Sequence, residues 1–157
     1  MLKAIPTAVL VVLLSGCANR GLPITQADID ERSRAKAAQE AIDRGIYPLA
    51  ESILAEFVYR DEKGSLKVKY WGLNSETRKM VIDSSMQLLW ETERYASAEE
   101  FANEYLSGSE RATMICRLAE QQRQFERAYS CWNQKGDPDR AERVLRSAAV
   151  VKILGDK

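Results

Sequence analysis

The feature that most constrains the fold is a series of short segments in which apolar residues recur every three or four positions. This spacing runs from Thr25 almost to the carboxyl end of the 157-residue chain, and it places apolar side chains on one face of an α-helix. Gly45 and Gly136 follow two of these segments, whereas Pro48 and Pro138 open two others, as is typical of helix ends and first helical turns. The sequence therefore predicts an all-α fold of about seven helices, arranged as antiparallel helical hairpins.

Capping residues give approximate bounds for these helices. Thr25 with Asp28 and Ser97 with Glu100 have the spacing of capping boxes, and Asp137 precedes a proline as an N-cap would. The predicted helices cover about 25–44, 48–60, 74–95, 97–107, 109–122, 124–135 and 138–154.

The segment 63–73 does not follow the helical period. Leu66, Val68 and Tyr70 alternate with Lys67 and Lys69, which favours a short strand. The Trp-Gly pair at 71–72 then breaks the alternation. A strand, a loop and a lid over the core all remain possible for this connection.

A short pattern recurs at three predicted hairpin turns. Residues 45–50 read Gly-x-Tyr-x-x-Ala, 123–128 repeat it with Arg and Phe in the first and third places, and 136–141 keep the Gly and the Ala. This resembles tetratricopeptide repeats, in which the glycine allows the turn, the aromatic residue packs between helices, and the alanine permits close approach. The resemblance implies a tetratricopeptide-like solenoid, while an irregular helical bundle of the same hairpins is the alternative.

The amino-terminal residues have the layout of an export signal. Lys3 precedes the apolar run 4–14, which is too short to span a bilayer. The run ends in Leu14-Ser15-Gly16-Cys17, which resembles the lipobox of bacterial lipoproteins. The resemblance implies a signal peptide at 1–16, a covalent lipid on Cys17, a lipidated tether at 17–24 and a helical domain at 25–157. In the bacterial lipoproteins that this segment resembles, an aspartate after the lipidated cysteine retains the protein in the inner membrane. The resemblance, with Ala18 at this position, therefore implies the periplasmic side of the outer membrane.

Cys116 and Cys131 lie on either side of the turn predicted near Arg123. Each is seven or eight residues from that turn, so both fall at the same height of an antiparallel hairpin. In the oxidising periplasm we expect them to form a disulfide, with two buried free thiols as the alternative.

Composition argues against most kinds of catalysis. The chain has no histidine, and its 23 Lys and Arg balance 23 Asp and Glu. A Ser-His-Asp triad and imidazole metal ligation are therefore excluded, and a nucleic-acid binder would normally show a basic excess. The carboxylate clusters at 28–31 and 99–100 fall in predicted first helical turns, where a negative charge interacts favourably with the helix dipole. We predict no catalytic residue, no metal, no cofactor beyond the lipid on Cys17, and no small-molecule substrate.

Two regions are candidates for partner binding. The residues that we select in them are Lys67, Lys69, Tyr70 and Trp71 in the connection, and Val151 and Leu154 in the last helix. Exposed aromatic residues anchor protein partners, and the apolar carboxyl-terminal residues are too many to face one core. The alternatives are a lid folded over the core and a terminal helix wedged in its own domain.

These observations lead to two hypotheses for function. The first is a lipid-anchored adaptor or assembly (pilot) factor that binds a protein of a secretion, pilus or conjugation complex. The second is a small inhibitor, immunity or exclusion lipoprotein that blocks an incoming protein. The resemblance to lipoproteins also implies contact with the membrane through the lipid.

Overall fold

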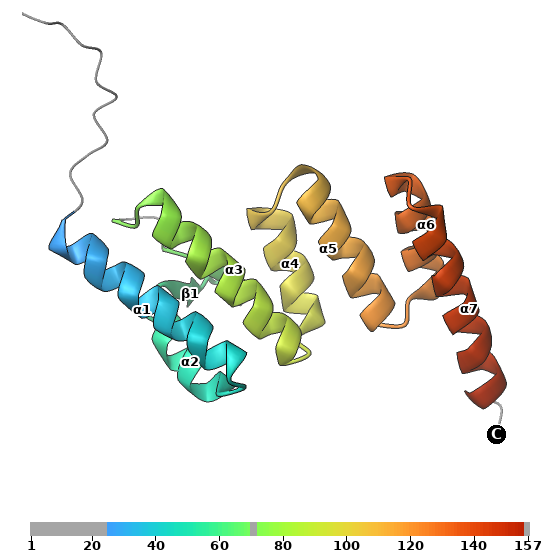
Figure 1. Ribbon diagram of the computed structural model, residues 1–157, viewed down its shortest axis with the longest axis horizontal. Coiled ribbons are helices and arrows are strands. Elements are labelled where there is room, and N and C mark those ends of the chain that lie inside the picture. Colours follow the sequence, from blue (N-terminus) through green and yellow to red (C-terminus); the bar gives the residue numbers. More distant parts are fainter. Residues whose placement is uncertain (1–24, 70–71, 156–157) are drawn as a thin grey trace, which may run out of the picture.

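The computed structural model describes residues 25–69 and 72–155, and this part of the chain is all-α apart from one small β-hairpin (Figure 1). Its seven helices are α1 (Gln26–Asp43), α2 (Tyr47–Leu54), α3 (Ser75–Glu91), α4 (Tyr95–Tyr105), α5 (Gly108–Gln121), α6 (Phe125–Lys135) and α7 (Pro138–Gly155). The predicted all-α class is confirmed. Cys17, Tyr70 and Trp71 lie outside the described residues.

The helices form a row of three hairpins followed by α7 (Figure 1). The hairpins pair α1 with α2, α3 with α4, and α5 with α6, and α7 then packs on α6. Successive hairpins meet through α1 and α2 against α3, and through α4 against α5. Helices far apart in the sequence thus lie far apart along the row, and α1 and α7 occupy its two ends.

Four turns between these helices share one geometry. The residues at the turning point are Gly45, Glu93, Arg123 and Gly136, with φ angles of 71°, 56°, 57° and 78°. In each turn the next residue donates its N–H to the carbonyl five positions back, as in a Schellman motif. An alanine five positions after the turning residue is buried in every case: Ala50, Ala98, Ala128 and Ala141. The turns predicted at 45, 123 and 136 are confirmed, and the one at Glu93 is new.

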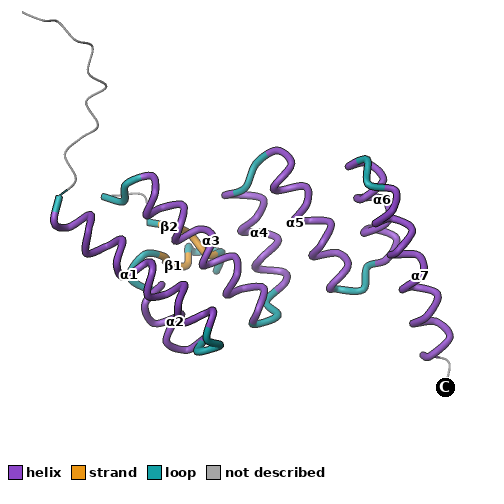
Figure 2. The backbone as a smooth tube through the Cα atoms, viewed as in Figure 1, coloured by secondary structure: helices purple, strands orange, loops and turns teal. Residues whose placement is uncertain are grey.

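A β-hairpin is inserted between α2 and α3 (Figure 2). Strand β1 (Val58–Arg60) pairs antiparallel with β2 (Leu66–Val68), and Val58 lies opposite Val68. Asp61 organises the loop, because its carboxylate accepts hydrogen bonds from the amides of Lys63 and Ser65 at 3.0 and 2.9 Å. The short strand expected at the start of the connection is confirmed as β2.

Three predicted helix bounds were wrong. The third helix ends at Glu91 and not near Tyr95, which begins α4. The second helix ends at Leu54 and not near Arg60, because Val58 and Tyr59 belong to β1, where β-branched and aromatic residues are favoured. Ser97 does not cap a helix, since α4 already begins at Tyr95 without a side-chain cap. After the Schellman turn at Glu93, α4 begins two residues before Ser97. By contrast, Thr25 and Asp28 form the expected capping box.

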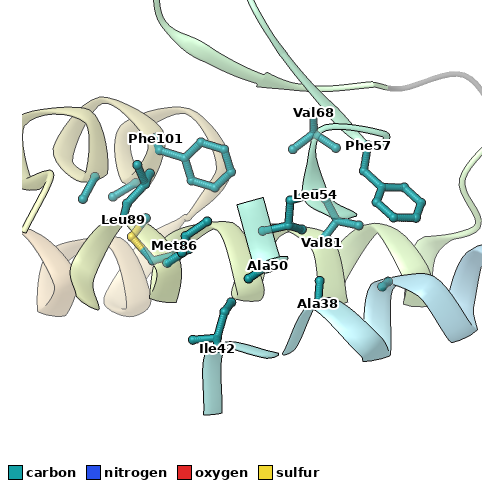
Figure 3. Packing of buried hydrophobic residues seen from close by; sticks show 14 of the residues in the cluster. Ala38, Ile42, Ala50, Leu54, Phe57, Val68, Val81, Met86, Leu89 and Phe101 are labelled. Carbon is teal, nitrogen blue, oxygen red and sulfur yellow. The ribbon is translucent and has the colours of Figure 1, made fainter. Parts of the chain in front are cut away.

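The buried residues form two clusters of unequal size. The larger cluster joins the first two hairpins, the β-hairpin and one face of α5. Figure 3 shows Val68 of the β-hairpin directed at Leu54 and Val81, with Ala38 of α1 on their far side. The smaller cluster, between α5, α6 and α7, holds only six buried residues, and three of them are alanines. Its one large member is Trp132, which is 1% exposed.

Candidate functional site

A disulfide joins α5 to α6, beside the smaller cluster. Cys116 and Cys131 are bonded, and their Cα atoms are 5.4 Å apart, so the predicted pairing is confirmed. Cys116 is fully buried. Trp132 follows Cys131, and its indole N–H donates to Glu120, while the Arg140 guanidinium lies 4.5 Å from its ring centroid. Because so few apolar side chains are buried here, this cross-link contributes a large share of the local stability.

The two lysines of the connection have partners within the chain. The ammonium of Lys67 donates to Glu104 of α4, and this hydrogen bond raises the pKa of Lys67. The ammonium of Lys69 donates to the carbonyls of Ala55 and Glu56 at 3.2 and 2.7 Å, at the carboxyl end of α2, where a positive charge is favoured. Both lysines therefore hold the β-hairpin onto neighbouring helices. Their role in partner binding, with that of Tyr70 and Trp71, stays a prediction.

The last turns of α7 carry uncovered apolar side chains. Val150 is 53% exposed, Val151 38% and Ile153 68%, and successive helical residues point about 100° apart. We call residues 150–153 the α7 tail. Three of its four side chains are apolar, and they point in different directions around the helix axis. Helix α7 has 18 residues and its partner α6 has 11, so no residue of α6 lies opposite the α7 tail. The side chain of Leu154 lies outside the described residues.

A small pocket lies beside β1, where the larger cluster comes to the surface. It has a volume of about 200 Å³, and most of its wall is apolar. The apolar wall comes from Leu54, Ala55, Val58, Leu66, Leu88 and Leu89. Arg60 and Arg94 also line the pocket, and Arg94 forms an ion pair with Glu51 at 2.8 Å. We call this cavity the β1 pocket.

The β-hairpin has a signal in the sequence, although residues 58–60 were assigned to a helix. Val58 and Tyr59 on one side of Lys63-Gly64 mirror Leu66 and Val68 on the other, which is the composition of a β-hairpin. The β1 pocket itself has no sequence signal, because it arises from residues of α2, β1, β2 and α3 that meet only in the fold.

A second hollow of about 290 Å³ lies between α3, the end of α4 and α5. The guanidinium of Arg117 stands 5.0 Å from the ring centroid of Trp90 there, and the acidic residues Asp83, Glu91 and Glu110 share the wall. Charges of both signs in this hollow are typical of an ordinary solvated surface between helices.

Residues 25–69 and 72–155 contain neither a group of metal ligands nor a helix that could span a membrane. No group of three or more Cys, Asp or Glu is placed there to hold a metal ion. None of the helices there is both long and apolar enough to cross a membrane.

Comparisons with protein-family models, with curated proteins and with solved structures gave no match to this chain.

Proposed function

We propose that this protein is a lipoprotein on the periplasmic side of the outer membrane that acts as an adaptor or assembly factor for an envelope complex. The observation that carries the proposal is the α7 tail, an apolar helical segment that no described part of the chain covers. Exposed apolar surface of this kind marks a site of protein contact. A partner helix or groove would bury Val150, Val151 and Ile153.

The arrangement of the helices supports the same role. A lipid on Cys17 would attach the chain at the end of the row where α1 begins, and α7 lies at the other end (Figure 1). The binding segment would thus project away from the point of attachment. In stacked hairpin proteins the terminal unit needs a polar outer face to stay soluble alone, whereas the last turns of α7 expose Val150, Val151 and Ile153.

The resemblance to tetratricopeptide repeats belongs to the proposal too. Four Schellman turns, each followed by a buried alanine, support it. Repeats of this type present extended surfaces to other proteins. The alternative, an inhibitor that blocks an incoming protein, depended on Tyr70 and Trp71, and no described residue favours it.

Site-specific photocrosslinking in intact cells tests the adaptor role. A photoreactive amino acid at Ile153 should give a covalent adduct with one envelope protein. The matched control is the same group at Lys36, an exposed position on α1 whose side chain is 71% accessible. We expect the adduct only at Ile153, and Ile153→Asp should abolish co-purification of the captured protein. Equal labelling at both positions, or none at Ile153, would contradict the proposal.

A second experiment tests the lipid anchor. Cys17→Ser removes the thiol that would carry the lipid, so the protein should leave the outer-membrane fraction and keep residues 1–16. Mass spectrometry of the unsubstituted protein should show acyl chains on a new amino terminus at Cys17. Unchanged sedimentation of the Cys17→Ser protein with the outer membrane would disprove lipidation.

A further inference from the structure

Strand β1 has one free hydrogen-bonding edge. Lys69 donates to the carbonyl of Phe57, and Asp61 donates to that of Ser65. In an antiparallel ladder hydrogen-bonded pairs alternate, so the amides and carbonyls of Val58 and Arg60 point away from β2. Among the described residues these four groups have no hydrogen-bond partner.

The opposite edge of the hairpin is in contact with α4. The amide of Val68, which points away from β1, donates to the hydroxyl of Tyr105 on α4 at 2.9 Å. The edge of β1 has no such neighbour, and all three of its residues line the β1 pocket. A free strand edge and an apolar cavity therefore lie side by side.

The wall of this pocket contains one polar group without a partner. Ser85 of α3 is 1% exposed, and its hydroxyl is buried without a hydrogen bond. A buried hydroxyl in this state carries a desolvation cost, which a ligand with a polar atom would offset. The remaining wall is mostly apolar, so the best occupant is an apolar group with a polar tip.

Size and charge restrict the occupant further. A volume of about 200 Å³ is below the range of pockets for drug-sized ligands but sufficient for one large side chain. At the rim, Arg94 is paired with Glu51, whereas Arg60 donates to the neutral carbonyl of Gly64 at 2.7 Å. The rim thus has one positive charge in excess and favours an acidic neighbour.

We propose that β1 accepts an extended segment of a partner protein as a third strand, and that this segment places a tyrosine side chain in the β1 pocket. The strand contributes main-chain hydrogen bonds to Val58 and Arg60, and the pocket provides specificity, as in other cases of strand addition. The tyrosine hydroxyl would pair with Ser85, and an acidic residue near it would pair with Arg60. This inference rests on the proposed adaptor function and names the chemistry of a second contact.

The test uses the full-length lipidated protein in nanodiscs and a labelled probe peptide, acetyl-Thr-Val-Tyr-Val-Asp-Thr-amide, with binding measured by fluorescence anisotropy. Two further peptides carry N-methyl groups on alternate backbone amides, the first on the odd-numbered residues and the second on the even-numbered ones. Alternate amides of a strand point to opposite edges, so only one of the two peptides has methyl groups facing β1. We expect that peptide to lose at least tenfold in affinity and the other to keep its affinity. A peptide with phenylalanine in place of tyrosine should bind about five- to tenfold more weakly.

Three protein variants complete the test. Ala55→Trp should fill the mouth of the pocket and prevent binding, whereas Ala37→Trp, at an exposed position on α1, should have no effect. Ser85→Ala should reduce affinity for the tyrosine peptide to that of the phenylalanine peptide and leave the latter unchanged. Circular dichroism of each variant confirms that it is folded.

Three results would overturn the inference: no binding of the tyrosine peptide, equal binding of both methylated peptides, or binding that survives Ala55→Trp. Failure here leaves the photocrosslinking at Ile153 unaffected, because that residue lies at the other end of the row. Conversely, loss of the Ile153 adduct would not change peptide binding. The two proposals can therefore fail separately.

Discussion

Removing the disulfide should destabilise α6 and α7 while the first two hairpins keep their stability. The perturbation is the double substitution Cys116→Ala and Cys131→Ala. These residues are 15 apart in sequence, and in the chain-entropy account a closed loop of this length stabilises the folded state by about 3 kcal/mol.

The smaller cluster has little else to stabilise it. Trp132 and Val144 are its only buried side chains larger than cysteine or alanine, and burying each contributes about 1.5–3 kcal/mol. The cross-link is thus of the same order as the contribution of these two side chains. No residue of α6 or α7 belongs to the larger cluster, so the loss stays local.

Hydrogen exchange followed by mass spectrometry would measure this effect. Amides of α6 and α7 should exchange about a hundredfold faster in the double variant, as about 3 kcal/mol implies, while those of α1–α4 keep their protection. Reduction of the unsubstituted protein should reproduce the pattern and should not affect the double variant. Uniform loss of protection along the chain, or none, would refute the argument for two separable cores.

Three further predictions concern caps and turns. Gly136→Ala places a Cβ at φ 78° and should cost about 1–2 kcal/mol, seen as a lower midpoint in denaturant unfolding. Arg123→Gly should act in the opposite sense, because φ is 57° there. It should raise the free energy of unfolding by up to about 1 kcal/mol, seen as a higher midpoint. The hydrogen bonds from Thr25 lower the pKa of Asp28, so the capping box is intact above pH 4 and is lost as the pH falls further. The amide of Thr25 should then lose its exchange protection only as the pH falls through this lowered pKa, and Asp28→Asn should remove this pH dependence; an unchanged profile in that variant would contradict the assignment.

Local chemistry explains which parts of the fold were predictable. Thr25, Pro48 and Gly136 act within one turn of the chain, and the structure uses them as the sequence indicates. The cysteine pairing also followed from local geometry, because one tight turn relates the two residues. The turn at Glu93 was missed because a non-glycine residue takes the left-handed conformation there, although Tyr95 and Ala98 supply the rest of the pattern.

Features that depend on contacts between distant segments were not predictable. Lys67 and Lys69 look like free surface charges in the sequence, but Glu104 and the end of α2 engage them. The same holds for the β1 pocket, where Ser85 meets residues about 30 positions away in sequence. Periodicity marks Ser85 as inward-facing, but it cannot reveal that its hydroxyl lacks a partner.

Helix α5 makes the chain divisible. Leu118 belongs to the larger cluster and Cys116 to the smaller one, so opposite faces of one helix serve the two cores. Substitutions on one face should therefore be additive in free energy with those on the other. In evolution, α5 is a natural boundary in the chain. The segment after it can be exchanged, lengthened or lost if one face of α5, the one that carries Cys116, is covered again. Sequence variation could then proceed at α6 and α7 without altering the first two hairpins.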